Sequence, residues 1–286
     1  MYKASRSQSA MEYLMTYGWA ILIIAIVIAA LFSLNIFSPF EFSPKASPGS
    51  CYVSKPDIYG SPIPPSLIGG GCSEIPEYTA QFNGQSSKIT AQNLEYTGIP
   101  DTVSVWVYPT GTGQQMGLVS AGWSLVINSL GEADFISESG IGGVIAGKLV
   151  PGQWNMITVT ISGSSNPGVD IYINGSSNAE NSLSGSLDTG YEYQIGGISA
   201  SPSSISSQYR YLGYMSDVQV YNTSLSYNSI QALYQEGIGG APIDLNNLVG
   251  WWPLNGNPND YSGNGNNGAA TNVIYTSNWY NGYSAP

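Results

Sequence analysis

The longest apolar stretch of the chain lies near its beginning. Residues 13–37 carry no charged side chain, and about 20 apolar residues in a helix are enough to cross the hydrocarbon core of a bilayer. A secretory signal has an apolar core of only about 7 to 15 residues, so this run is too long for one. Because Lys3 and Arg6 precede the run and the long remainder is acidic, we expect a cytoplasmic N-terminus and an external remainder.

A short polar motif stands directly before that run. Residues 6–13 read Arg-Ser-Gln-Ser-Ala-Met-Glu-Tyr, which resembles the class III signal peptide of archaeal type IV pilin-like proteins. The resemblance implies that a prepilin peptidase removes a cytoplasmic leader, residues 1–7, by cutting between Ser7 and Gln8. Glu12 then becomes the fifth mature residue and pairs with the new amine, while the helix at residues 8–37 packs into a filament core. The alternative is a single-span anchor whose glutamate reaches the membrane edge.

Alternation with a period of two dominates the chain from residue 78 onward. In residues 102–108, Val103, Val105 and Val107 share one face of an expected half-buried strand. Many such short strands predict a mainly-β head, built as a two-sheet antiparallel sandwich or jelly roll. Further strands are expected at residues 154–161, 169–173 and 215–221, with Asn174-Gly175 as a hairpin turn.

One helix is expected among these strands. Ile230, Leu233 and Tyr234 have the spacing of one helical face. Ser226 is a suitable N-cap and Gly237 a suitable stop. We therefore predict a short helix that lies on the surface of the sandwich.

Several motifs follow one another in a set order within residues 78–237. They are Phe82-Asn83-Gly84, residues 103–109 with Trp106, Gly152-Gln153-Trp154, residues 172–175 and residues 212–222. Their order and spacing resemble the laminin-G-like, concanavalin A-like lectin/glucanase family. The resemblance implies a jelly-roll sandwich, a fold that hosts lectins, adhesive modules and hydrolases, so it leaves the function open.

The end of the chain carries a motif in an unusual place. Residues 248–268 resemble the segment that normally opens a laminin-G-like domain, yet here they come last. Roughly 40 residues cannot bury a core alone, whereas Trp251, Trp252 and Trp279 need burial. Segment 246–286 could complete its own sandwich as a circular permutation, complete a neighbour's sandwich, or be a truncated second domain. We favour the first alternative because domain termini often lie close together.

Between the apolar run and the head lies a segment rich in Pro, Gly and Ser, residues 38–77. Its prolines predict a stiff stalk. The chain's two cysteines, Cys51 and Cys72, lie within it, and an even count outside the membrane predicts a disulfide. Closing a loop of this size contributes roughly 3 kcal/mol in the chain-entropy model.

Composition narrows the function further. Only 9% of the 286 residues are charged, while the chain has 35 Gly, 21 Tyr and 7 Trp, as suits a tyrosine-rich secreted β protein. The formal charge of −11 argues against nucleic acid and anionic membrane surfaces as partners. Because histidine is absent, Ser-His triads and histidine metal sites are excluded.

One loop has the residue spacing of a calcium site. Asp260, Ser262 and Asn264, followed by Gly265, match the first positions of an oxygen-rich calcium loop. Thr271 stands where an EF-hand has its glutamate. Calcium is therefore a candidate cofactor, no cofactor is required, and the simpler alternative is a turn rich in Asn and Gly.

Catalytic carboxylates are not evident in the sequence. A retaining glycosidase of this fold needs two carboxylates about 5 Å apart, commonly in a Glu-x-Asp-x-x-Glu strand. The nearest segment, Glu132-Ala133-Asp134, has Ser137 in place of the third acid, and Asp188 and Glu192 are too isolated to nominate. We therefore expect no enzyme activity.

Two sequons offer modification sites. Asn174-Gly175-Ser176 and Asn222-Thr223-Ser224 satisfy the N-glycosylation rule at the ends of expected strands.

The sequence thus predicts four parts: a leader, a pilin helix, a stalk and a head at residues 78–286. We expect a subunit of an extracellular type IV pilus-like filament, inserted in the cytoplasmic membrane as a precursor. Its partners would be other copies of itself, the pilus assembly machinery, and surface glycans or partner cells. The alternative is a membrane-tethered carbohydrate-binding or carbohydrate-active surface protein that does not polymerise.

Overall fold

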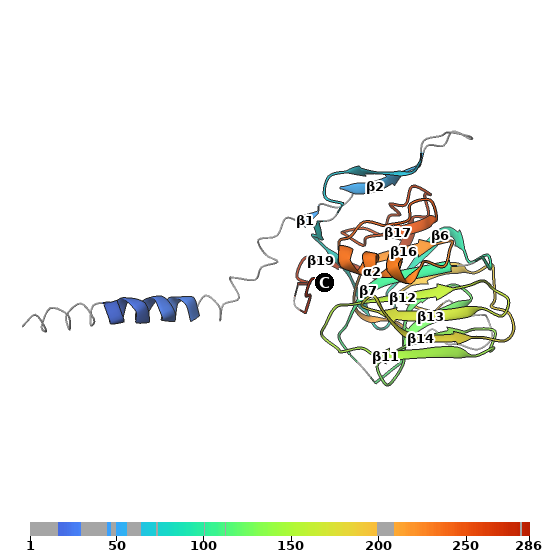
Figure 1. The fold of residues 1–286 in the computed structure, drawn as a ribbon, viewed down its shortest axis with the longest axis horizontal. Helices are drawn as coiled ribbons and strands as arrows, with labels where there is room; N and C mark the ends of the chain where they lie inside the picture. Colours follow the sequence, from blue (N-terminus) through green and yellow to red (C-terminus); the bar gives the residue numbers. More distant parts are fainter. Residues whose placement is uncertain are drawn as a thin grey trace, which may run out of the picture. The chain divides into compact units, whose positions relative to one another are not determined.

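The computed structural model describes residues 17–29, 45–46, 50–55, 64–72, 74–99, 101–111, 113–198, 209–280 and 282–286. The chain forms two units, residues 1–43 and residues 44–286 (Figure 1).

The first unit is described only as a helix at residues 17–29, all of them exposed. A helix of this length spans about 20 Å at 1.5 Å per residue, less than the roughly 30 Å of a bilayer core. Within the described ranges, no helix is both long and apolar enough to cross a membrane. Of the long apolar helix predicted at residues 8–37, the structure describes only this short helix. The rest of that range lies outside the described residues, as do Ser7, Gln8 and Glu12.

The second unit contains a sandwich of two antiparallel sheets, which confirms the architecture predicted for the head (Figure 1). Over the described residues, the strand order of the first sheet is β11-β10-β9-β8-β15-β6-β18. Its strands are β6 (Lys88–Glu95), β8 (Met116–Ser120), β9 (Trp123–Ile127), β10 (Glu132–Ser137), β11 (Gly143–Lys148), β15 (Glu192–Ile195) and β18 (Gly268–Thr271).

The second sheet has the order β14-β13-β12-β7-β16-β5-β19, and β17 also pairs with β16. Several of its strands match the segments that the alternating pattern predicted. They are β5 (Thr79–Asn83), β7 (Asp101–Pro109), β12 (Asn155–Ile161), β13 (Gly168–Ile173), β14 (Ser176–Ser182), β16 (Leu212–Tyr221), β17 (Leu248–Trp252) and β19 (Ile274–Thr276).

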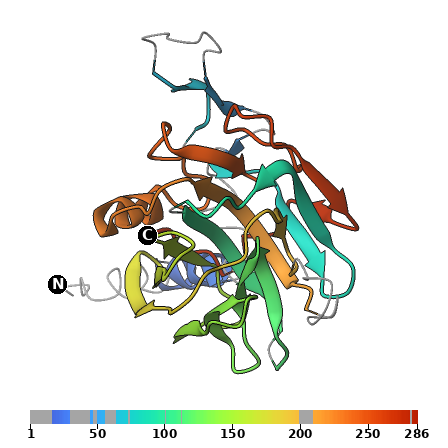
Figure 2. The same cartoon turned by 90° about the vertical axis from the view of Figure 1, so that its right-hand side faces the viewer.

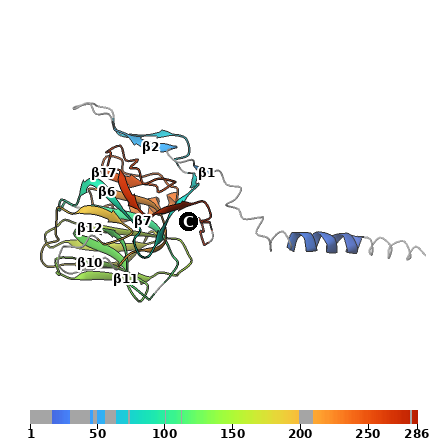
Figure 3. The same ribbon diagram turned by 180° about the vertical axis from the view of Figure 1, so that it is seen from behind.

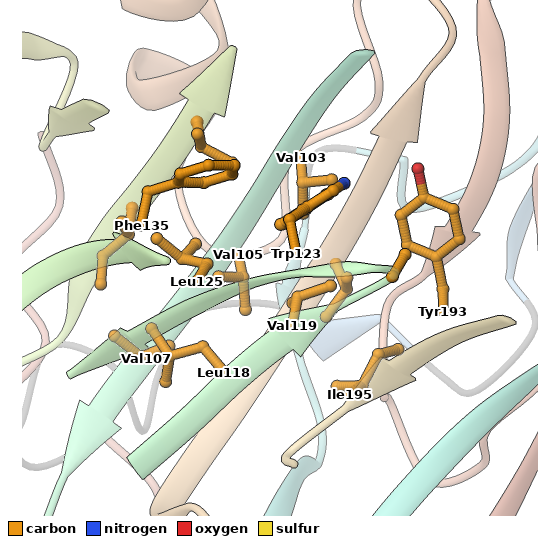
Figure 4. Close-up of a cluster of buried hydrophobic side chains, with 14 of the residues drawn as sticks. Val103, Val105, Val107, Leu118, Val119, Trp123, Leu125, Phe135, Tyr193 and Ile195 are labelled. Carbon is orange, nitrogen blue, oxygen red and sulfur yellow. The ribbon is translucent and has the colours of Figure 1, made fainter. Parts of the chain in front are cut away.

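The core lies between the two sheets. Val103, Val105 and Val107 point from β7 into it, as their alternation predicted, and are fully buried. Figure 4 shows them beside Trp123 of β9 and Tyr193 of β15, which belong to the opposite sheet. The period-two pattern therefore identified the inner face of this sheet correctly.

The outer face of β7 is also buried, so the expected half-buried strand is wrong. The helix α2 (Tyr227–Glu236) covers this face: Trp106 stacks on Tyr234 of α2 with ring centroids 5.7 Å apart. Tyr283 from the C-terminal segment meets the same indole edge to face. The predicted caps of this helix, Ser226 and Gly237, are confirmed.

A tight turn joins β13 to β14. Asn174 and Gly175 both have positive φ, 53° and 73°, as the predicted Asn-Gly hairpin requires. The Asn174 side chain also accepts a hydrogen bond from the Met156 backbone N–H at 2.9 Å.

The C-terminal segment completes the sandwich of its own chain. It contributes β18 beside β6, β19 beside β5 and β17 beside β16, and Figure 2 shows its red strand next to the teal β6. Trp252 is fully buried, and its indole N–H donates to the Asn266 carbonyl at 3.0 Å. This strand pairing is the one that the first alternative for the tail expected.

The predicted disulfide between Cys51 and Cys72 is confirmed, with an S–S distance of 2.05 Å. It closes a hairpin of β2 (Cys51–Ser54) and β3 (Ser66–Gly69), while β1 (Lys45–Ala46) pairs in parallel with β4 (Ile75–Pro76). This hairpin contacts the head (Figure 3), where the Val53 N–H donates to the Tyr261 carbonyl at 2.8 Å. The described part of the predicted stalk therefore packs on the sandwich.

Candidate functional site

A cavity opens at the rim of the sandwich, where β6 leads into β7. Its volume is about 210 Å³, well above the roughly 10 to 15 Å³ that one water needs. We call it the rim pocket, and it is lined by Leu94, Glu95, Tyr96, Thr97, Ile99, Asp101, Tyr193, Asn222 and Val249.

The floor of the rim pocket consists of three buried polar side chains. Tyr96, Asp101 and Tyr193 are only 1%, 2% and 2% exposed. The Tyr193 hydroxyl, on β15, donates a hydrogen bond to the Asp101 carboxylate at the start of β7. In Figure 4 this hydroxyl points away from Ile195, toward the end of the core. The hydrogen bond joins the two sheets at the base of the pocket.

The electrostatics of the floor follow from its burial. Loss of solvent raises the pKa of Asp101 to about 7, against the lowering effect of the hydrogen bonds from Tyr193 and the Thr102 backbone. Burial and the nearby Asp101 carboxylate also raise the pKa values of Tyr193 and Tyr96. Both phenols therefore stay protonated at neutral pH, and Asp101 keeps its proton to a higher pH than an exposed carboxyl does.

The buried Tyr96 hydroxyl on this floor lacks a hydrogen-bond partner among the described residues. A buried polar group left without a partner costs roughly 1 to 3 kcal/mol. Since Tyr96 lines the cavity, a bound molecule could supply that partner.

The mouth of the rim pocket is more exposed than the floor. Glu95, Thr97, Ile99 and Asn222 are exposed. Asn222 is held there by the segment that follows it, because the Thr102 hydroxyl donates to the Thr223 carbonyl at 2.6 Å and accepts from the Leu225 N–H at 2.9 Å.

More than half of the chain matches one known protein family. The family model described as the concanavalin A-like lectin/glucanases superfamily matches residues 83–231. The chain belongs to this superfamily. No protein of curated description matches its sequence.

Two solved structures show the same concanavalin A-like fold. A putative carbohydrate binding protein from Bacteroides ovatus has 15% identity and a TM-score of 0.53, covering 81% of this chain and 70% of its own. A heptameric SAP-like pentraxin from Limulus polyphemus has 16% identity and a TM-score of 0.53, covering 70% of this chain and 94% of its own. At these identities the likeness concerns the fold alone.

The structure brings the three candidate calcium ligands together in one turn, but it occupies them with other hydrogen bonds. The Asp260 carboxylate accepts from the N–H groups of Trp251, Ser262 and Asn266 and from the Ser262 hydroxyl. The side-chain oxygen of Asn264 accepts from the Lys55 ammonium at 3.1 Å. A cationic side chain and N–H donors at these oxygens favour the alternative, a structural turn, so we do not propose calcium here.

A second buried carboxyl, Asp217, stabilises the fold. It accepts from the Gln219 side-chain amide at 3.0 and 2.9 Å and from the Trp251 indole at 2.8 Å. Burial raises its pKa to about 7 against the lowering effect of these hydrogen bonds. The cavity that it lines is only about 40 Å³, so we do not assign it a ligand.

The acids considered for catalysis lie elsewhere on the first sheet. Glu132 and Asp134 lie two residues apart on β10, and burial together with Glu132 raises the pKa of Asp134 to about 6. Ser137, in place of a third acid, is buried and bonded to Ser139. Glu192, which the sequence showed as too isolated to nominate, pairs across strands with Glu95 at the pocket mouth.

The sequons differ in their surroundings. Asn222 is exposed at the mouth of the rim pocket, whereas both polar atoms of the Asn174 amide form hydrogen bonds. Modification at either site stays a prediction. Of the sequence candidates that the structure describes, only Asn222 lines the rim pocket.

The floor residues were missed in the sequence. Asp101 offered one signal, since a carboxyl group is unexpected at the start of a strand whose inner face is made of valines. Tyr96 and Tyr193 gave none among 21 tyrosines.

Proposed function

We propose that this protein is a non-catalytic carbohydrate-binding protein of the cell surface, and that the rim pocket holds one sugar residue of a glycan. The observation that carries the proposal is the Tyr96 hydroxyl, which is buried at the floor of the cavity and has no hydrogen-bond partner among the described residues. Sugar sites combine apolar surface with a few well-placed polar groups, and here Leu94, Ile99 and Val249 supply the apolar part.

Family membership and the similarity to a putative carbohydrate binding protein support this proposal. Binding without cleavage is supported by the floor geometry, because the Asp101 carboxyl is engaged by Tyr193 and so is not poised to act as a nucleophile or general acid. The predicted external position of the head would present the pocket to surface glycans.

We expect Tyr96→Phe to weaken glycan binding about 3- to 10-fold while leaving the fold intact, because the lost hydroxyl has no partner in the described part of the chain. A neutral hydrogen bond contributes about 0.5 to 1.5 kcal/mol, and about 1.4 kcal/mol corresponds to tenfold in affinity. Binding would be measured by glycan array and calorimetry on the full chain, held in a polyoxyethylene detergent whose head group carries no sugar.

Tyr52→Phe is the matched control, since Tyr52 is 45% exposed and distant in sequence from the pocket lining. Unchanged affinity in Tyr96→Phe would reject the pocket as the glycan site. Release of new reducing ends from a bound glycan would reject the non-catalytic proposal.

A second candidate, the filament subunit, is supported by the leader motif and by Glu12. We expect Glu12→Ala to leave membrane insertion and leader cleavage intact and to abolish filaments, because only the pairing with the new amine is lost. Negative-stain images of sheared surface material, probed for this chain, would check it. Normal filaments from the variant would contradict this role, and an uncleaved monomer in the wild type would favour a simple tether.

A further inference from the structure

Hydrogen-bond acceptors outnumber donors on the floor of the rim pocket. Asp101, when ionised, offers only acceptor oxygens, and a cation bound beside it favours the ionised form. Tyr193 has committed its proton to Asp101, so its oxygen can only accept from a ligand. Tyr96 is the one floor hydroxyl with an uncommitted proton among the described residues. A ligand that brings several donors therefore matches this floor better than one that brings acceptors.

The surrounding charge has a single sign. Glu95 lines the mouth and lies directly opposite Glu192 on the neighbouring strand. Like charges in such a cross-strand pair are destabilising, and a cation between or near them relieves the repulsion. No Lys or Arg is found among the described residues that line the pocket.

The size of the cavity limits the ligand. At about 210 Å³ the pocket is smaller than the roughly 300 to 1,000 Å³ of drug-sized sites. Its apolar wall of Leu94, Ile99 and Val249 suits the carbon body of a single ring. A protonated primary amine carries three hydrogen-bond donors and one positive charge. Its donors can bond to the acceptors of the floor, and its charge complements the negative charge of Glu95 and Glu192.

We propose that the rim pocket selects an amino sugar with a free ammonium group, placing that group between Glu95 at the mouth and Asp101 at the floor. This inference rests on the proposed glycan function of the same pocket. Acetylation of the amine would remove the charge and two of the three donors, so the acetylated sugar should be the weaker ligand.

The test compares four probes by calorimetry at pH 7 with the full chain in a polyoxyethylene detergent: methyl glucosaminide, methyl N-acetylglucosaminide, methyl glucoside and hexylamine. We expect the free amino sugar to bind at least tenfold more tightly than either neutral sugar. That preference should shrink as salt rises from 50 to 500 mM, because exposed charges are screened.

Two variants locate the preference. Glu95→Gln changes an exposed side chain and should reduce the preference for the amine several-fold with little effect on the neutral sugars. Glu180→Gln, an exposed glutamate of β14 outside the pocket lining, is the matched control and should change nothing.

The possible failures are distinguishable. Equal affinity for the three sugars would overturn the charge selection and leave the glycan pocket standing. Binding of no sugar would overturn both proposals. Hexylamine binding as tightly as the amino sugar would support an ammonium site and overturn the glycan function. An unchanged preference in Glu95→Gln would overturn the placement of the amine.

Discussion

Truncation of the chain before Asn246 is expected to leave a head that no longer unfolds cooperatively. The deletion removes β17, β18 and β19, so β16, β6 and β5 each lose a paired neighbour. It also removes the buried side chains of Trp251, Trp252, Leu254 and Trp279. Loss of one large core side chain costs about 3 to 5 kcal/mol, so the loss of four is comparable to or larger than the roughly 5 to 15 kcal/mol stability of a typical domain.

Far-UV circular dichroism during urea unfolding would measure this effect in the full chain. Deleting only residues 284–286, which are exposed, is the matched control and should leave the unfolding midpoint unchanged. A truncated chain with the wild-type midpoint would show that the tail is an appendage. Swapped dimers of the intact head would support strand exchange between chains instead.

Stability should fall as the pH rises from 5 to 8. Burial raises the folded-state pKa values of Asp101 and Asp217 from 3.8 to about 7. An acid whose pKa is raised on folding binds its proton more tightly in the folded state, so its stabilising effect is complete below the unfolded pKa. That effect is lost as the pH passes from about 4 to about 7.

Each of these carboxyls should cost about 2 to 3 kcal/mol of unfolding free energy between pH 5 and pH 8. The half-buried Asp134, with a pKa raised to about 6, adds a smaller effect in the same direction. Urea unfolding at the two pH values would measure the change.

Asp101→Asn should flatten part of this pH dependence, because the amide oxygen can still accept the hydrogen bond from Tyr193 but no proton is bound or released. Asp188→Asn is the control, at a partly exposed acid outside the pocket lining. Equal stability of the wild type at pH 5 and pH 8 would contradict the prediction.

The elements that sequence analysis predicted well depend on local pattern. Val103, Val105 and Val107 marked the inner face of β7 by alternation alone. Ser226 and Gly237 marked the ends of α2 by capping chemistry, and Asn174-Gly175 marked a turn through its positive φ values. Each of these signals operates over a few residues and is therefore visible in one sequence.

Features that depend on distant neighbours were not visible. The strand at residues 102–108 was expected to be half-buried, because local alternation carries no information about Tyr234 and Tyr283, the distant residues that cover Trp106. The rim pocket likewise needs Tyr96 and Asp101, at the two ends of one loop, to meet Tyr193 far along the chain. The packing of the two sheets brings these residues together, and no short sequence motif indicates that contact.

The position of the closing strands has a consequence for how the protein is made. The Trp279 indole donates to the Pro76 carbonyl across 203 residues, and the Ser87 hydroxyl donates to the Asn272 carbonyl across 185. During synthesis the β5 and β6 strands appear well before their tail partners, β19 and β18. Contacts so distant in sequence slow folding, and unpaired strand edges are prone to aggregation. The sandwich therefore cannot be completed in the nascent chain until the tail segment that pairs with β5 and β6 has been translated.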